Sequence, residues 1–282
     1  MPLLQSPTIA YLGPAGTYSE AAAETYAHQS YPHSDQIQLC PYPSIFQTLQ
    51  AVARGEVDIG VVPVENSIQG SVTMTLDALW QLAGLQIQQA LVLPIAHVFI
   101  SQAKQLTQIK TVYSHPQALA QCQQWLEHHL SHIQLIPTNS TTEALQHLAT
   151  ETTAGAISSE RAAKLYQLPV LADGISDYPE NCTRFWVVSL RPSPGGNHTS
   201  LGFSVPANIP GTLVKPLQIF ATRNINLSRI ESRPTKRSLG DYVFFVDIEA
   251  NTTAPSVQSA LVELKSHTET IKVFGSYNII SS

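Results

Sequence analysis

The stretch Arg191-Pro-Ser-Pro-Gly-Gly-Asn-His198 divides this chain of 282 residues into two unequal parts. Two prolines and two glycines within so short a segment can continue neither a helix nor a central strand, so the stretch predicts a linker. Roughly 190 residues precede it and roughly 85 follow it. Because domains usually contain about 100–200 residues, we expect two domains.

The composition is that of a globular chain with few charges. Hydrophobic residues make up 43% and charged residues only 12%, against roughly 25% charged residues in ordinary soluble chains. The longest apolar runs, 57–64 and 91–100, are far shorter than the roughly 20 residues of a membrane-spanning helix, and each contains a proline. The net charge of −5 argues against a basic nucleic-acid-binding surface. We therefore expect neither membrane nor nucleic acid as a partner.

The three cysteines, Cys40, Cys122 and Cys182, are far apart and form no C-x-x-C pair. This pattern supports neither a disulfide framework nor a zinc site. No basic residue or apolar run typical of a signal peptide precedes Thr8. These features predict a cytoplasmic protein with free thiols and no bound metal.

Before the linker, runs of strand-forming residues alternate with helical patterns. Strands are expected at Thr8–Leu12, Gln38–Tyr42, Val57–Val62, Thr111–Tyr113, Gln134–Pro137 and Ala154–Ile157, and helices at Ser19–His28, Ser44–Ala53, Pro116–Leu130, Thr142–Ala149 and Ser159–Gln167. The alternation predicts a mostly parallel sheet covered on both faces by helices, with ligands at the carboxyl ends of the strands. The apolar run over 82–100 suggests a division into two lobes, the second covering about 86–170.

After the linker, the expected elements follow the order βαββαβ of a ferredoxin-like unit. They are Ser200–Val205, Gly211–Ala221, Ile225–Arg233, Asp241–Glu249, Ala254–Ser266 and Thr270–Tyr277. A small sheet with helices on one face often leaves an edge strand open for pairing. The tail is therefore expected to associate with a second copy.

Two segments after expected strands combine glycines with polar residues. Gly13-Pro-Ala-Gly-Thr-Tyr-Ser-Glu20 has the spacing of a capping box and opens a helix, whose N-terminus attracts anions. Glu65, Asn66 and Ser67 can hold a substrate hydroxyl or carboxylate. An ordinary strand-to-helix turn, and a polar turn ending at Gly70, are the alternative interpretations.

Polar residues also follow two later strands. Ser114 and Gln121 are two helical turns apart and face the same side, whereas His115 is expected to be structural. Arg184 suits a carboxylate and Thr183 offers a hydroxyl, although an ion pair at the rim of the protein explains the arginine equally simply. The residues alone thus predict an anion-binding cleft and leave its reaction open.

In this order, six segments resemble those of the prephenate dehydratase family over nearly the whole chain. They are Gly13–Ser19, Glu65–Gly70, Ser114–Gln117, Thr183–Phe185, Gly211–Val214 and Glu231–Pro234. The resemblance implies an α/β catalytic region over 8–190 with the two-lobed fold of type II periplasmic binding proteins and an active site between the lobes. A linker over 191–198 and an ACT regulatory domain over 199–282 would follow.

The family converts prephenate to phenylpyruvate with loss of water and carbon dioxide, which implies no metal and no organic cofactor. By resemblance, Thr183 is the hydroxyl near the leaving group and Arg184 binds a carboxylate. The other catalytic residues implied are Glu65, Asn66, Ser114 and Gln121. The substrate-binding residues implied are Gly16, Thr17, Ser19, Ser67, Gly70 and Phe185. Tyr18 replaces the family's usual phenylalanine.

The ACT domain implies feedback control by L-phenylalanine, bound between paired domains of a homodimer or homotetramer. The effector-binding residues implied are Gly211, Thr212, Leu213, Val214, Asn226, Leu227, Glu231, Ser232, Arg233 and Pro234. Thr212 stands where the family usually has alanine, and Pro216 lies near the first turn of the next helix, where proline is tolerated.

Two alternative functions are compatible with the same motifs. An arogenate dehydratase performs the same elimination on a substrate that carries an ammonium in place of the ketone. A non-catalytic sensor could combine a binding-protein fold with an amino-acid-binding domain, but it would not need Thr183. The short segment before Thr8 indicates a monofunctional enzyme without a preceding chorismate mutase.

Overall fold

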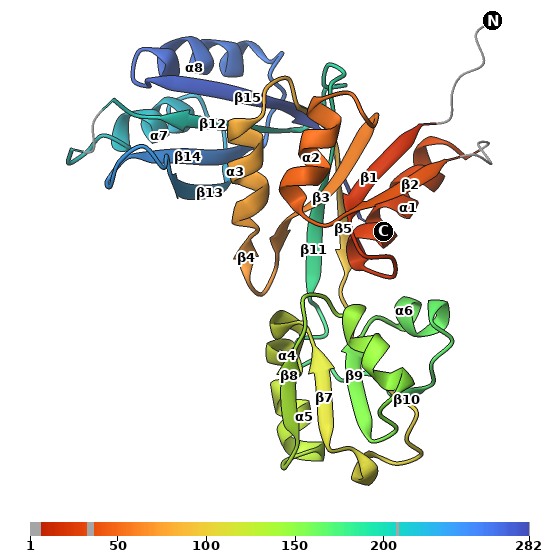
Figure 1. The fold of residues 1–282 in the computed structure, drawn as a ribbon. Helices are drawn as coiled ribbons and strands as arrows, with labels where there is room; N and C mark the ends of the chain where they lie inside the picture. The colour runs from red at the N-terminus through yellow and green to blue at the C-terminus, as the bar shows by residue number, and fades with distance from the viewer. Residues whose placement is uncertain (1–6, 33–36, 207–208, 282) are drawn as a thin grey trace, which may run out of the picture.

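The computed structural model describes residues 7–32, 37–206 and 209–281. Three compact units make up the molecule, as Figure 1 shows: two lobes that meet end to end, and a C-terminal domain packed beside the first lobe. The mixed α/β fold class expected from the sequence is confirmed.

The first lobe is built on a seven-stranded sheet of order β16-β5-β11-β3-β1-β2, with β4 pairing to β3. Its strands are β1 (Thr8–Leu12), β2 (Gln38–Tyr42), β3 (Ile59–Asn66), β4 (Gly70–Ser71), β5 (Gln86–Pro94), β11 (Cys182–Ser189) and β16 (Ile279–Ser281). Its helices are α1 (Tyr18–Ser30), α2 (Ile45–Ala53) and α3 (Thr73–Gln81).

The sheet of this lobe is mostly parallel, as expected, but β11 runs antiparallel to both of its neighbours, β3 and β5. The chain leaves the first lobe along β5 and returns along β11. These two crossing strands lie side by side and must therefore run in opposite directions. This return brings Thr183 next to Asn66 of β3 in the strand register.

The second lobe contains a five-stranded sheet of order β10-β6-β9-β7-β8. Its strands are β6 (Val98–Ser101), β7 (Thr111–Ser114), β8 (Gln134–Pro137), β9 (Ala154–Ser158) and β10 (Val170–Ala172). Its helices are α4 (Pro116–Gln121), α5 (Gln123–His129) and α6 (Glu160–Leu165), with 3₁₀ turns η1 (Leu106–Gln108) and η2 (Glu143–Ala149).

Two sequence expectations for this lobe are corrected. Because β5 pairs within the first sheet, the second lobe begins after residue 94 rather than near residue 86. The single helix expected over 116–130 is interrupted at Cys122, whose φ of −124° and ψ of 18° are not helical. That break lets α4 and α5 take separate directions.

The C-terminal domain has the expected βαββαβ order, with a sheet of order β13-β14-β12-β15. Its elements are β12 (His198–Ser204), α7 (Val214–Ala221), β13 (Leu227–Pro234), β14 (Tyr242–Ile248), α8 (Pro255–Lys265) and β15 (Thr270–Tyr277). Helices α7 and α8 pack on one face around Phe220 and Leu264. On the other face, Phe245 and Phe274 join the core of the first lobe.

The chain ends outside this domain, which corrects the boundary expected at residue 282. After β15, strand β16 pairs in parallel with β5 of the first lobe, from Ile279 opposite Ala90 to Ser281 opposite Val92. The linker is held close to this crossing, since a Cβ on Gly196 would lie 2.1 Å from the carbonyl carbon of Tyr277. Only glycine fits there. The C-terminal domain is thus fastened to the first lobe at both of its ends.

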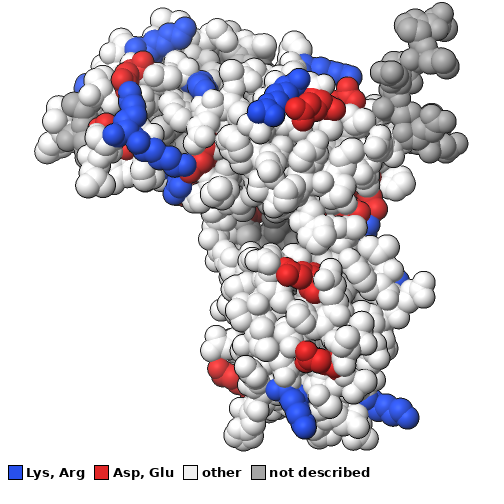
Figure 2. Space-filling model, in the orientation of Figure 1, with Lys and Arg blue, Asp and Glu red and all other residues white. Residues whose placement is uncertain are grey.

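No helix in the described part of the chain is long and apolar enough to cross a membrane. Cys40, Cys122 and Cys182 are all unpaired. The low charge content is visible in Figure 2, where large areas over both lobes carry no charged side chain.

Candidate active site

A cavity of about 820 Å³ lies between the two lobes. Thr17 and Ser19 line it from the first lobe, and Ser140 and Glu143 from the second. A smaller cavity of about 140 Å³ shares part of this wall, including Tyr18, and extends to Asn66, Gln121 and Thr183. Ligand sites of this size class commonly combine an apolar wall with a few directed polar groups. The candidate site therefore comprises a wide outer cavity and a narrow polar inner cavity.

The N-terminus of α1 forms one wall of the outer cavity. Thr17 caps the helix by accepting from the Glu20 backbone N–H at 3.4 Å, as the capping-box spacing predicted. The Tyr18 hydroxyl donates to the Ala96 carbonyl at 2.5 Å, immediately before the second lobe. Since the first N–H groups of a helix have no partner within it, this wall offers neutral donors to an anion.

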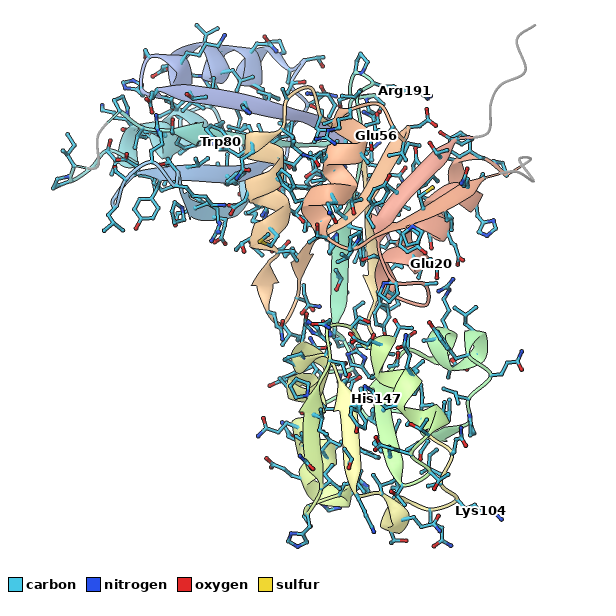
Figure 3. All side chains as sticks on the ribbon, viewed as in Figure 1. Glu20, Glu56, Trp80, Lys104, His147 and Arg191 are labelled. Carbon is cyan, nitrogen blue, oxygen red and sulfur yellow. The ribbon has the colours of Figure 1, made fainter. Side chains whose placement is uncertain are left out.

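Glu20 joins the two lobes beside that helix end, and Figure 3 labels it at the edge of the first lobe that faces the second. Its carboxylate accepts from the Gly16 N–H at 2.7 Å and from the Arg161 guanidinium of α6 at 2.6 Å. Burial alone would raise the pKa of Glu20, but the hydrogen bonds from Gly16, Arg161 and Tyr11 outweigh it and lower that pKa. Glu20 is thus an ionised link across the cleft. The same hydrogen bond holds the backbone of Gly16 close to the second lobe. A Cβ at this position would lie 2.8 Å from Thr142 Cγ2, so a larger residue does not fit without a shift.

A network of side-chain amides forms the inner cavity. The Asn66 amide donates to Thr183 Oγ1 at 3.0 Å and to Asn181 Oδ1 at 2.8 Å. The Asn181 amide in turn donates to Gln121 Oε1 at 3.1 Å. Three of the sequence-predicted residues, Asn66, Gln121 and Thr183, are therefore brought together from β3, α4 and β11. All three are at least nine-tenths buried.

The Thr183 hydroxyl accepts a hydrogen bond in this network but donates none to any described residue. Its hydrogen is therefore available to a bound molecule. An N–H donor on the oxygen also makes a hydroxyl a better donor, because hydrogen bonds in a chain polarise one another. The inner cavity thus presents a polarised hydroxyl to its contents.

Arg184 and Glu65 do not line either cavity. Successive residues of a strand point to opposite faces, so each is directed away from its neighbour Thr183 or Asn66. Arg184 Nη1 lies 3.5 Å from Glu65 Oε2 and 3.6 Å from Asp247 Oδ2 of β14. The arginine, which was expected to bind a substrate carboxylate, thus faces the C-terminal domain.

Asp247 is the centre of this second charged group. Its side chain is 1% exposed and accepts from Arg229 Nε at 2.8 Å, Arg229 Nη2 at 3.2 Å and Ser200 Oγ at 2.5 Å. The Arg229 guanidinium lies 5.3 Å from the ring centroid of Trp186 on β11. The C-terminal domain thus contacts the strand that carries Thr183 through Asp247 and Arg229.

Four other expected site residues lie outside the cavities. Ser114 is fully buried and donates to the Ile157 carbonyl at 2.7 Å, while Ser67 donates to Asn181 Oδ1 at 3.2 Å. Phe185 lies in the core of the first lobe. Gly70 has a φ of +76° in an open turn with nothing near its Cβ position. None of these four lines a cavity.

Several residues that line the cavities or hold their walls were not expected from the sequence. His115 was predicted to be structural and does cap α4, accepting from the Gln117 N–H at 3.2 Å, but it also lines both cavities. His97 hydrogen bonds to Gln121 at 2.9 Å. Asn181 connects Asn66 to Gln121. A lone histidine or asparagine carries little signal in a sequence, although the places of His97 and His115 after β5 and β7 do mark them for attention.

The cavity walls contain neither lysine nor arginine among the described residues, and no described group of three or more His, Cys, Asp or Glu side chains could hold a metal. An anion here would therefore be held by neutral N–H and O–H donors. This favours chemistry by orientation and hydrogen bonding.

The expected effector residues occupy two segments of the C-terminal domain. Gly211–Val214 lead into α7, with Gly211 at a φ of +83° and Val214 exposed. Asn226 directly precedes β13, the edge strand, which begins at Leu227 and ends with Glu231–Pro234. Arg233 is bound by Asp77 of α3 through contacts of 3.0 and 3.1 Å. Trp80, labelled in Figure 3, packs beside them against Phe245.

The comparisons agree with this division of the chain. Residues 9–193 match the family model for prephenate dehydratase, and residues 199–266 match that for the ACT domain. The bifunctional chorismate mutase/prephenate dehydratase of Aquifex aeolicus is 40% identical over 95% of this chain and 73% of its own length. The prephenate dehydratase of Methanocaldococcus jannaschii is 38% identical over 96% of this chain and 98% of its own.

A solved structure is similar over the same extent. The crystal structure of prephenate dehydratase in complex with L-Phe from Arthrobacter aurescens has a TM-score of 0.85 and 34% identity to this chain. The match covers 96% of this chain and 90% of that one. The similarity therefore includes the arrangement of all three units.

Proposed function

The chain belongs to the prephenate dehydratase family, and on that premise we propose how its own residues perform the family's reaction, the decarboxylating dehydration of prephenate to phenylpyruvate. In this reaction the bond between the ring and its carboxylate breaks, and carbon dioxide leaves. The electron pair enters the ring as it becomes aromatic. The ring hydroxyl departs with its bonding electrons and gains a proton to become water.

We place the departing hydroxyl in the inner cavity, next to Thr183. The observation that carries this assignment is the Thr183 hydroxyl itself, which accepts from Asn66 at 3.0 Å and has its hydrogen free. A donor aimed at an oxygen that gains negative charge stabilises the transition state more than the ground state. Thr183 therefore assists departure by hydrogen bonding, and Asn66 acts on it as a positioning residue.

The outer cavity would hold the two carboxylates. Prephenate is a dianion, and the available donors are the N-terminal N–H groups of α1 with the hydroxyls of Thr17 and Ser19. Neutral donors bind the dianion without fixing the carboxylate so strongly that its loss as carbon dioxide is opposed. Arg184 is left out of direct substrate binding because it lies on the opposite face of β11.

The residues that line the outer cavity favour binding of prephenate over binding of arogenate. The ammonium of arogenate needs an acceptor, and Glu143 is the one carboxylate among the described residues that line the cavities. Its oxygens already accept from the Asn139 backbone N–H at 2.9 Å and from the Asn139 amide at 3.3 Å. A ketone needs no such acceptor.

We further propose that L-phenylalanine binds to the ACT domain and lowers activity. The Phe-bound relative from Arthrobacter aurescens supports this effector. The proposed site is formed by Gly211–Val214, Asn226 and Leu227 with Glu231–Pro234, between the domains of two copies joined near the edge strand β13. An effector acts only if it binds the two states of the enzyme unequally. Asp247 and Arg229, which contact Arg184 and Trp186 of β11, offer a route from that domain to the strand of Thr183.

A homodimer or homotetramer and a cytoplasmic location complete the proposal. The exposed edge of β13 and the exposed Val262 of α8 support self-association. Three unpaired cysteines suit a reducing compartment. Sedimentation with and without L-phenylalanine tests the assembly, and a monomer under both conditions would contradict it.

The reaction is tested by incubating the purified chain with prephenate and following phenylpyruvate by absorbance. We expect turnover of prephenate with a kcat/KM well above that for arogenate. If only arogenate reacts, the substrate assignment is wrong, and if neither reacts, the enzyme assignment is wrong. Replacing Glu143 with Gln should leave prephenate turnover nearly unchanged.

A further inference from the structure

His97 lies at the inner end of the inner cavity, just beyond β5, and takes part in none of the steps described so far. His97 is 4% exposed, and its ring packs edge-on to the ring of Tyr18 at a centroid distance of 6.0 Å. Its one side-chain hydrogen bond joins Nε2 to Gln121 Oε1 at 2.9 Å. The other ring nitrogen, Nδ1, is buried without a partner among the described residues. The polar contact of this buried ring is thus directed entirely at Gln121.

The direction of every hydrogen bond in the network follows from two backbone amides. Asn66 Oδ1 accepts from the backbone N–H groups of Ile68 and Gln69, both at 3.1 Å. Because a backbone N–H can only donate, this atom must be the oxygen, and the Asn66 nitrogen must face Asn181. Asn181 then has its oxygen toward Asn66 and its nitrogen toward Gln121.

This order fixes the orientation of Gln121 and the tautomer of His97. Gln121 Oε1 accepts from Asn181 at 3.1 Å, so the atom that faces His97 is a carbonyl oxygen. His97 must therefore carry its hydrogen on Nε2. Burial lowers the pKa of His97 more than its hydrogen bond to Gln121 raises it, so the ring is neutral at ordinary pH. Gln121 is left with its amide nitrogen buried and without a hydrogen-bond partner among the described residues.

We propose that His97 is a positioning residue of the reaction: with Asn181 it holds the Gln121 carbonyl, so that the Gln121 N–H groups remain free for the oxygen that leaves prephenate. Gln121 and Thr183 line the same inner cavity, and together they supply two donors to that oxygen. Without His97 the amide of Gln121 can rotate, and its N–H groups lose their fixed direction. This inference rests on the proposed function, because it assigns His97 to the same elimination.

The test compares three replacements of His97 in the full-length enzyme. His97→Gln places an amide N–H near the position of Nε2, whereas His97→Asn reaches only the position of Nδ1, and His97→Phe keeps the ring shape without a donor. We expect kcat to fall about 100-fold for Phe and Asn, as for a misplaced catalytic group, with KM changed less than about threefold. His97→Gln should retain activity within about fivefold of the wild type.

A double-variant cycle separates positioning from a structural role. In a Gln121→Ala background His97 has nothing to position, so adding His97→Phe should lower kcat less than about twofold further. Unfolding temperature and L-phenylalanine binding at the distant ACT domain check that each variant is folded. The proposal is overturned if His97→Phe keeps wild-type kcat, if His97→Gln is no better than His97→Phe, or if the loss is as large without Gln121. Absence of turnover by the wild type would instead contradict the proposed function.

Discussion

Asp247→Asn tests the contact between the C-terminal domain and the strand that carries Thr183. The change keeps the size of the side chain and removes its charge. Asp247 is 1% exposed and is bound by Arg229 at 2.8 and 3.2 Å, with Arg184 at 3.6 Å. Two cations would then lose their shared counter-charge, and Arg229 is itself 8% exposed.

The expected loss is large because one partner of a buried ion pair is removed. Such changes cost about 3–5 kcal/mol, since the remaining charge is buried without compensation. Each kcal/mol of lost unfolding free energy lowers the Tm of a protein of roughly this size by about 2–4 °C. A decrease in Tm of roughly 6–20 °C is therefore expected. Thermal unfolding followed by circular dichroism measures it. If the contact also transmits the effector's action, inhibition by L-phenylalanine should weaken in the same variant.

Asp173→Asn is the matched control, because Asp173 is exposed and makes no ion pair with any described residue. Its Tm should change by no more than about 2 °C, as is usual for surface substitutions. Adding Arg229→Met to Asp247→Asn should cost less than the sum of the two single changes, because each removes the same contact. A Tm for Asp247→Asn within about 2 °C of both the wild type and Asp173→Asn would show that the buried charge of Asp247 does not hold the two domains together.

Two further changes test the packing between and within the lobes. The lowered pKa of Glu20 means that its link to Arg161 contributes stability above the unfolded pKa of about 4.3 and loses it as pH falls through the folded value; Glu20→Gln should therefore be less stable than wild type at pH 7, with the difference in Tm narrowing as pH falls below about 4.3, and a constant difference would contradict this. Gly155→Ala should lower the free energy of unfolding by about 1–3 kcal/mol through overpacking, because its Cβ would lie 2.1 Å from the buried Phe99 Cζ. Gly60→Ala should lower it less, because its Cβ would lie 2.9 Å from Val52 Cγ2. Urea unfolding measures both, and the reverse order would count against the packing described.

Local periodicity was sufficient to predict most strands and helices. The strands Thr8–Leu12 and Thr270–Tyr277 have the expected bounds, because alternating or continuous apolar residues determine them locally. The break at Cys122 was missed because neither glycine nor proline marks it. The pairing of Ile279–Ser281 with β5 was missed as well, since it depends on a partner almost 190 residues away in the sequence.

In the site, too, local patterns in the sequence could be predicted, whereas contacts between distant segments could not. Strand alternation already implies that Thr183 and Arg184 face opposite sides of β11, so the two side chains meet different surroundings. What Arg184 meets instead, Asp247, is brought there by the docking of a separate domain. The roles of His97 and Asn181 depend on their hydrogen bonds to Gln121 and Asn66. The fold brings these partners together from other elements, so the sequence alone does not show the contacts.

The proposed reaction depends above all on the free hydroxyl of Thr183, which assists the departing oxygen of prephenate. The most direct measurement is kcat for phenylpyruvate formation by Thr183→Val and Thr183→Ser beside the wild type. Valine keeps the shape without the hydroxyl, and we expect its kcat to fall at least about 100-fold, whereas serine should retain activity within about tenfold. A Thr183→Val enzyme that forms phenylpyruvate at the wild-type rate would contradict the account.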